Sequence, residues 1–286
     1  MPSLIDIRRR IRSVKNTQQI TKAMKMVSAA KLRRAQDRVI TSRPYGALLR
    51  QVLGNVAAAV GTGEQAGQNP LLAKRPEERI LLVLITSDKG LAGAFNANLI
   101  KGAQRFTADR HGASVKMVLV GRKGRDFFRK RGADVAGEHI NLAAKAAYQD
   151  TAAIAGKAME MYCAEEIDAV YLIGNEFKSV MSQKLTVTRV LPVEVGEQAA
   201  PVDYLFEQPP AEMLNALLPR YVELEFYRAL LESTAAEHAA RMTAMDAATS
   251  NAGEMIEKLT LFMNRVRQAS ITKEIIEVVS GAAAAE

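Results

Sequence analysis

A glycine-containing loop is the first stretch of this sequence that could bind a substrate. Residues 87–93 (SDKGLAG) follow an apolar run and precede a helical segment, where backbone N–H groups could bind a phosphate. The spacing does not fit, because a dinucleotide fingerprint needs G-x-G-x-x-G and a P-loop needs G-x-x-x-x-G-K-[ST]. We therefore expect Gly90 and Gly93 to let a strand turn sharply into a helix.

The other candidate chemical groups are scattered. Residues 121–125 (GRKGR) could bind an anion but are expected to be a solvated helix start. The three histidines, His111, His139 and His238, have no cysteines or paired carboxylates at the spacing of metal ligands. Cys163 has no histidine near it, which favours a packed or surface thiol over a nucleophile. We predict no catalytic residue, no cofactor and no metal.

Composition excludes several classes of protein. The 286 residues are 48% apolar and 24% charged, typical of a globular chain, and 5% aromatic, which argues against a surface that stacks bases or sugars. A single cysteine excludes an intramolecular disulfide and favours a reducing compartment. The longest apolar run, residues 80–85, is far shorter than the roughly 20 residues that a membrane-spanning helix needs. The arginine-rich start has no apolar region behind it, so no signal peptide is expected.

The net charge of +8 is concentrated at one end of the chain. Residues 1–50 contain 13 basic and two acidic residues, whereas the remaining 236 residues sum to −3. Such a segment faces an acidic partner or is strongly solvated.

A long helix is predicted at the N-terminal end. Residues 3–43 contain no glycine or proline and consist mostly of good helix formers. The apolar spacing continues past Pro44, where a kink can form, to about Val60. Residues 61–70 then have the composition of a loop.

A second long helix is predicted at the C-terminal end, after a proline-containing linker at residues 196–210. From residue 220 to 280 the only helix breaker is Gly253, and Pro219 is expected to interrupt or cap the first turns. A small central domain cannot cover two helices of this length, so we expect them to pack against each other.

Between residues 79 and 195 short apolar runs alternate with helical segments. The expected strands are residues 80–88, 115–121, 168–177 and 182–193, and the expected helices are residues 91–110, 122–132 and 143–165. Strands separated by helices pair in parallel through right-handed crossovers. The middle of the chain is therefore predicted to be a small α/β domain with a mostly parallel sheet.

A seven-residue spacing predicts that the two terminal helices form a coiled coil. The inward positions of the C-terminal helix are Met242, Met245, Thr249, Ala252, Ile256, Leu259, Met263 and Val266. Those of the N-terminal helix begin with Leu4, Ile7, Ile11 and Val14. Polar residues then break this seam (Gln18, Thr21 and Lys25), and we expect it to shift to Ile20, Met24 and Val27. The supercoil should be left-handed and locally irregular.

Both ends of the sequence resemble a known family. Residues 16–27 (NTQQITKAMKMV), residues 267–274 (RQASITKE) and residues 279–282 (VSGA) are similar to the terminal signatures of the gamma subunit of F-type ATP synthase, of the bacterial type. The segment SDKGLAGAFN (87–96) also resembles that family.

The resemblance implies a rotor shaft rather than an enzyme. The terminal helices would form an asymmetric antiparallel coiled coil inside a ring of alpha and beta subunits, one copy per complex. The α/β domain would lie beside the epsilon subunit and the c-ring. The chain would couple ion-driven rotation to conformational change at the beta subunits and break no covalent bond itself. It would be peripheral, at the cytoplasmic face of the bacterial inner membrane. A bacterial origin is expected because no transit-like leader precedes the first helix.

The same resemblance implies which residues contact partners. Arg267 and Gln268, with Thr272 beside them, would bind a catch loop of one beta subunit, and Met24 would face the acidic hinge loop of beta. Tyr204 resembles a foot residue near epsilon and the c-ring. Further charged contacts with the ring are expected at Arg9, Arg10, Lys22, Lys25 and Arg241.

The predicted organisation comprises a coiled-coil helix (1–60), a linker (61–78), the α/β domain (79–195), a second linker (196–210) and the other coiled-coil helix (211–286). Two other classes of function remain. A nucleotide-dependent enzyme predicts that the 79–195 fragment binds a nucleotide, which isothermal titration would detect. A nucleic-acid-binding coiled coil predicts salt-dependent DNA affinity that survives deletion of residues 268–286. We expect no nucleic acid partner, because the basic helix also has apolar positions that must be buried along its length.

Overall fold

The computed structural model describes residues 3–60, 69–110, 112–145, 147–194 and 206–283. It consists of two compact units. The helical unit comprises Met1–Ala29 and Arg241–Glu286, and the sheet unit comprises Ala30–Ala240.

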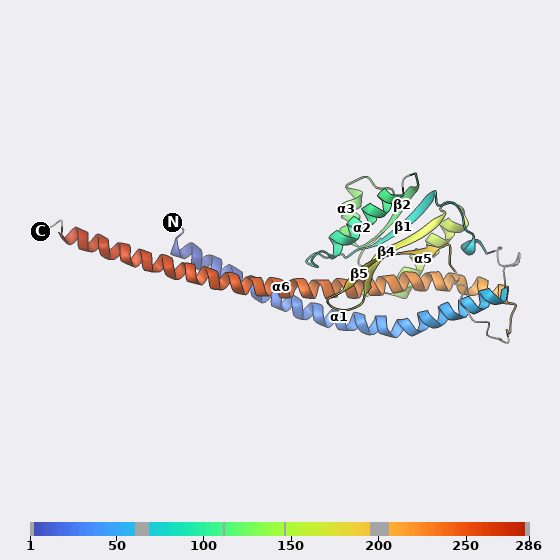
Figure 1. Cartoon of the computed structure of the whole chain (residues 1–286), viewed down its shortest axis with the longest axis horizontal. Coiled ribbons are helices and arrows are strands. Elements are labelled where there is room, and N and C mark those ends of the chain that lie inside the picture. Colours follow the sequence, from blue (N-terminus) through green and yellow to red (C-terminus); the bar gives the residue numbers. More distant parts are fainter. Residues whose placement is uncertain (1–2, 61–68, 111, 146, 195–205, 284–286) are drawn as a thin grey trace. The chain divides into compact units, whose positions relative to one another are not determined.

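Two long helices contribute to both units (Figure 1). Helix α1 spans Leu4–Val60 and continues through Pro44, as the sequence predicts. Helix α6 spans Pro210–Ala283 and contains Pro219 within it. The prediction that Pro219 interrupts or caps the first turns is therefore wrong. Proline is well suited to the first turn at Pro210, where no N–H donor is needed, and the buried Leu218 stabilises the turn that Pro219 weakens.

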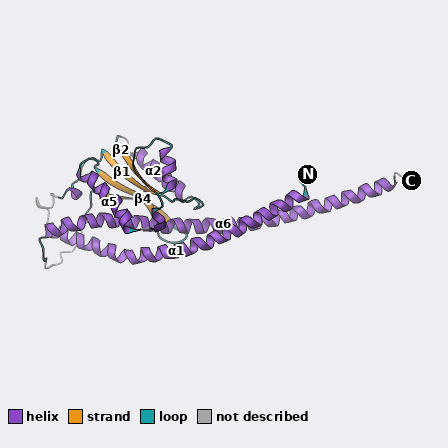
Figure 2. Ribbon diagram, turned by 180° about the vertical axis from the view of Figure 1, so that it is seen from behind, coloured by secondary structure: helices purple, strands orange, loops and turns teal. Residues whose placement is uncertain are grey.

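Within the sheet unit, five strands form one sheet in the order β3-β2-β1-β4-β5. Figure 2 shows the sheet in orange, with β1, β2 and β4 labelled. The strands are β1 (Arg79–Ile85), β2 (Ser114–Val120), β3 (Val135–His139), β4 (Ala169–Phe177) and β5 (Gln183–Leu191). The pairs β1–β2, β1–β4 and β2–β3 are parallel, and β4–β5 is antiparallel. The prediction of an α/β domain with a mostly parallel sheet is confirmed.

The shorter helices connect these strands. They are η2 (Pro70–Leu72), α2 (Phe95–Asp109), α3 (Arg122–Arg129), α4 (Leu142–Lys145) and α5 (Tyr148–Cys163). The single helix predicted at 143–165 is two helices. Strand β3 was not predicted, because its sequence VAGEH lacks an apolar run. It lies at the sheet edge, where alternate residues remain exposed.

Both faces of the central strand β1 are buried. On one face Ile80, Leu82 and Leu84 pack with Leu99 and Phe106 of helix α2. The alternate residues Leu81, Val83 and Ile85 are also buried. Burial on both sides explains why β1 is a continuous apolar run rather than an alternating one.

Asp168 connects the start of β4 to the start of β1. Its buried carboxylate accepts hydrogen bonds from the backbone N of Arg79 at 2.8 Å, from Nε at 3.2 Å and from Nη2 at 2.8 Å. The guanidinium of Arg79 lowers the pKa of Asp168 below its usual value. A lowered folded-state pKa stabilises the fold above the unfolded pKa, and this stability is lost as the pH falls through the folded pKa.

Asp168→Asn is therefore expected to lower the free energy of unfolding at pH 7 by about 1–2 kcal/mol, the low end for a charged hydrogen bond because Arg79 is half exposed. The difference from the unmodified chain should shrink as the pH falls from 5 towards 3. Urea unfolding across that range measures it. Asp109→Asn, at an exposed ion pair with Arg105, is the matched control. A deficit that stays constant with pH would contradict the assignment.

Candidate functional site

The glycine-containing loop after β1 is held by its own polar side chains. The Ser87 backbone N donates to Asn96 Oδ1 at 3.0 Å, and Ser87 Oγ donates to the Lys89 carbonyl at 2.6 Å. The Asp88 carboxylate accepts from the backbone N of Arg122 at 3.1 Å and of Asn141 at 3.0 Å. A carboxylate therefore lies against the N-terminus of α3, the helix start that residues 121–125 would offer to an anion. This arrangement disfavours an anion at that second candidate loop.

The second candidate loop, residues 121–125, is fitted tightly against Thr86. Thr86 Oγ1 donates to the Val120 carbonyl at 3.0 Å and accepts from the Gly124 backbone N at 2.9 Å. Gly121 has φ +94°, and a Cβ built on it would lie 2.1 Å from the Thr86 carbonyl oxygen. The two glycines of this motif allow α3 to approach β1 closely. Their role here is backbone packing.

The histidines and the cysteine are spread over the sheet unit. His139 lies at the end of β3, and burial lowers its pKa. His238 lies on α6, and Cys163 is exposed at the end of α5. His111 falls outside the described residues. Among the residues that the structure describes, no group of three or more histidine, cysteine or acidic side chains could hold a metal ion.

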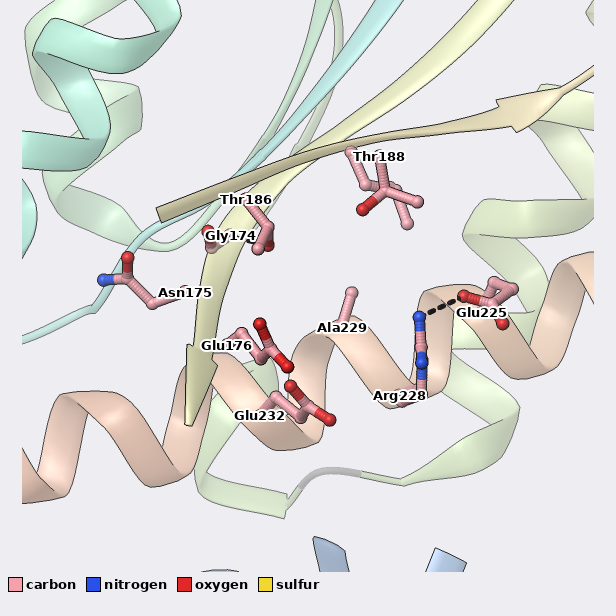
Figure 3. Close-up of a pocket in the computed structure, with 10 residues that line it drawn as sticks. Gly174, Asn175, Glu176, Thr186, Thr188, Glu225, Arg228, Ala229 and Glu232 are labelled. Atoms are coloured by element: carbon pink, nitrogen blue, oxygen red, sulfur yellow. Dashed lines mark hydrogen bonds and ion pairs between the residues drawn. The ribbon is translucent and has the colours of Figure 1, made fainter. Parts of the chain in front are cut away.

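A cavity of about 220 Å³ lies between strands β4 and β5 and helix α6 (Figure 3). Arg228 donates to Glu225 at 2.7 Å, and Glu225 also accepts from Arg50 of α1 at 2.9 Å. Glu232 lies 3.7 Å from Arg43 of α1. Burial, and less strongly the charge of Glu176, raises the pKa of Glu232, although both arginines near it oppose this. These ion pairs connect α1 and α6 within the sheet unit.

In the helical unit, α1 and α6 lie side by side and antiparallel (Figures 1 and 2). Thr21 Oγ1 and Thr249 Oγ1 are 2.8 Å apart, and Lys25 Nζ lies 2.6 Å from Asp246 Oδ1. The predicted seam of α6, from Met242 to Val266, is confirmed. Its eight inward residues are buried or partly buried, whereas most of the residues between them are exposed.

The predicted seam of α1 is wrong in its second half. The seven-residue spacing does not shift to Ile20, Met24 and Val27, because Gln18, Thr21 and Lys25 themselves face α6. Ile20 is 60% exposed and Val27 is 56% exposed. These polar side chains can occupy inward positions of the coiled coil because each forms a hydrogen bond or an ion pair with α6. We call Ile20 and Val27 the outer apolar face of α1, whereas Met24 is partly buried.

The residues expected to contact partners differ in exposure. Arg267, Gln268 and Thr272 are exposed on α6, where Thr272 Oγ1 donates to the Gln268 carbonyl at 2.9 Å. On α1, Arg9, Arg10 and Lys22 are exposed and Met24 is partly buried. Lys25 is paired with Asp246, and Arg241 is only 8% exposed. Tyr204 lies outside the described residues.

The structure brings the expected residues together in two places. Lys22, Met24 and Lys25 lie within one turn of α1, and Arg267, Gln268 and Thr272 lie within two turns of α6. Sequence reasoning placed Ile20 and Val27 in the seam and missed that they are exposed beside the first group. The signal was the unbroken seven-residue spacing through Thr21 and Ser28, both of which are buried.

Helix α6 extends past the N-terminal end of α1 (Figure 1). Its last turns carry exposed apolar side chains at Ile271, Ile275, Ile276, Val278 and Val279. An exposed apolar surface of this kind is typical of a contact with another protein. None of the described helices has an apolar stretch long enough to cross a bilayer.

Comparisons with known proteins consistently match this chain to ATP synthase sequences. A family model described as ATP synthase matches residues 3–285. The ATP synthase gamma chain of Solibacter usitatus is 76% identical over 286 residues, covering 100% of both chains. That of an Anaeromyxobacter species is 52% identical over 290 residues, covering 99% of each.

Solved structures of rotary complexes share the fold. A chain in the central stalk and c-ring structure of Tetrahymena thermophila mitochondrial ATP synthase has a TM-score of 0.61 at 25% identity, covering 80% of this chain and 99% of that one. A chain of Euglena gracilis mitochondrial ATP synthase has a TM-score of 0.68 at 21% identity, covering 98% of this chain and 94% of that one.

Proposed function

This chain belongs to the family of ATP synthase gamma chains, and on that premise we propose that it is the central rotor shaft of an F-type ATP synthase. It transmits ion-driven rotation of a c-ring to the catalytic beta subunits. The observation that carries the proposal is the helical unit, whose two helices present apolar side chains outward, on the outer apolar face of α1 and on the last turns of α6.

The shaft acts through its lack of symmetry. Three beta subunits with the same sequence surround the shaft. At each rotational position of the shaft, each of them contacts a different face of it. One face offers Ile20 and Val27, others carry arginine and lysine side chains of α1, and the end of α6 is apolar. Each beta subunit is therefore biased differently between its open and closed states. A shift from mostly open to mostly closed takes roughly 5.5 kcal/mol of differential contact, which a few charged hydrogen bonds and apolar contacts supply. Rotation moves this bias around the ring.

We propose the individual contacts that the resemblance to the family implies. Arg267 and Gln268, with Thr272, bind a loop of one beta subunit, and Met24 faces an acidic loop of beta. The charged residues Arg9, Arg10, Lys22, Lys25 and Arg241 add contacts with the ring, Lys25 and Arg241 only after some rearrangement. Tyr204 contributes at the foot, near epsilon and the c-ring. Support comes from the high positive charge of residues 1–50, which favours acidic partners.

The remaining features of the proposal concern assembly. The chain binds the alpha and beta ring, epsilon and the c-ring, in one copy per complex, and performs no catalysis itself. It is peripheral at the cytoplasmic face of the bacterial inner membrane, held there by its partner subunits.

The exposed Cys163 offers a direct test of rotation. A gold rod is attached to this cysteine in the complex isolated from membranes, with the catalytic ring immobilised and other accessible cysteines removed. Addition of ATP should turn the rod in one direction. A Cys163→Ser complex, which should hydrolyse ATP but bind no rod, is the control. A ring that hydrolyses ATP while bound rods stay still would refute the shaft function.

A further inference from the structure

The helical unit places polar side chains where a coiled coil normally buries apolar ones. Thr21 and Thr249 meet in the seam, with their hydroxyl oxygens 2.8 Å apart. Gln18 Nε2 donates to the Thr249 carbonyl at 3.4 Å. Meanwhile the outer apolar face, with Ile20 and Val27 more than half exposed, points away from α6. Turning α1 about its axis would bury that face instead, so apolar burial alone does not select the observed pairing.

The polar contacts are compatible with one axial position of the helices. Thr249 is the single polar residue among the eight inward positions of α6 from Met242 to Val266. A slip by one seven-residue repeat would place Thr21 opposite Met242 or Ile256. Each hydroxyl has one proton, so one of the two donates to the other, and the accepting one donates within its own helix, Thr21 to the Gln18 carbonyl or Thr249 to the Met245 carbonyl. Slipping therefore forfeits the contacts between the helices, after which each hydroxyl donates within its own helix.

Gly253 and an ion pair select the same position. A Cβ on Gly253 would lie 3.2 Å from Gln18 Nε2, so the missing side chain leaves room for the glutamine. After a slip, Asp246 or Thr260 would occupy that place, each with a side chain. The same slip would move Lys25 from Asp246 to Ala239 or Gly253, neither of which is an acceptor of its charge.

We propose that Gln18, Thr21 and Thr249, with the gap at Gly253, form a register layer that fixes the axial position of α1 against α6. Polar residues at inward positions are known to specify register at a cost in stability. The consequence for coupling rests on the function proposed above. The register decides which residues of α1 lie level with which residues of α6, and hence which combination of side chains a beta subunit meets. These are positioning residues, because they act through the contact surfaces.

The test measures the register directly in the full-length chain. Spin labels are placed at the exposed positions Ser13 and Lys258 after substitution by cysteine, in a Cys163→Ser background. The unmodified layer should give one narrow distance distribution. The pair Thr21→Val with Thr249→Val keeps the shape of the side chains and removes the hydroxyls. We expect it to broaden the distribution or add a second distance, since a slip of one repeat moves a label by roughly 10 Å along the axis.

The matched control pair, Thr21→Ser with Thr249→Ser, retains both hydroxyls and should restore the single narrow distance. The melting temperature shows whether the two hydroxyls set the register or only stabilise the coiled coil. The valine pair should melt at the same or a higher temperature, because apolar residues replace polar ones in the seam. A valine pair that keeps the narrow distance, or that only melts earlier, overturns the proposal. Helix content by circular dichroism verifies that each variant folds. This measurement involves no ring, so its failure is distinct from a failure of the rotation test.

Discussion

Replacing Arg267 and Gln268 together with alanine is expected to lower ATP-driven ion uptake by the assembled complex about tenfold or more. Both side chains are exposed on α6 and are proposed to bind one beta subunit. Removing charged or polar hydrogen bonds from a desolvated interface costs about 2–5 kcal/mol, and each 1.4 kcal/mol is a factor of ten. Ion uptake and ATP hydrolysis in inverted membrane vesicles measure the effect.

The free chain should not be affected by this double substitution. Its melting temperature is expected to stay unchanged, because neither side chain is buried. Glu257→Ala with Lys258→Ala, at exposed positions of the same helix, is the matched control and should leave ion uptake intact. If the variant with both alanines took up ions at the wild-type rate, Arg267 and Gln268 would not form the proposed contact with a beta subunit.

Gly121→Ala is expected to lower the free energy of unfolding of the sheet unit by about 3–5 kcal/mol. The new Cβ would lie 2.1 Å from the Thr86 carbonyl oxygen, and the backbone has φ +94°. Neither the strand nor α3 can move without breaking the hydrogen bonds of Thr86. All seven tyrosines lie between residues 30 and 240, and the chain has no tryptophan. Tyrosine fluorescence during urea unfolding therefore reports on this unit.

Gly112→Ala separates the two causes of that destabilisation. Gly112 has a similar φ of +101°, but nothing lies within 4 Å of a Cβ built there. Its substitution carries the backbone strain alone and should cost about 1–2 kcal/mol. Equal losses for the two variants would show that the close approach to Thr86 contributes nothing.

Buried strands were easier to predict from the sequence than strands at the exposed edge of the sheet. Strand β1 is apolar on both faces, so it was evident from its composition, whereas the edge strand β3 has no apolar run and was missed. The break between α4 and α5 was also missed, because no glycine or proline lies between them. Pro219 misled the prediction that the first turns of α6 are interrupted or capped, since a proline signal takes no account of the burial of Leu218.

The glycine motifs show the same limit for the site. Their spacing excluded the known nucleotide fingerprints, yet spacing alone could not reveal that Asp88 lies against the start of α3. That contact joins residues 34 positions apart in the chain. Similarly, the ion pairs of Glu225 and Glu232 with α1 depend on partners that only the fold brings near.

By itself the sequence determined the two long helices, the mostly parallel sheet, the seam of α6 and the resemblance to ATP synthase gamma subunits. Each of these depends on local periodicity, on helix propensity or on contiguous motifs. Only the tertiary structure decided which face of α1 meets α6. Two sets of residues with the same spacing competed, one polar and one apolar, and hydropathy favoured the apolar set. The polar set faces α6 because Thr21 and Gln18 find hydrogen-bonding partners on Thr249, 228 and 231 residues further along the chain.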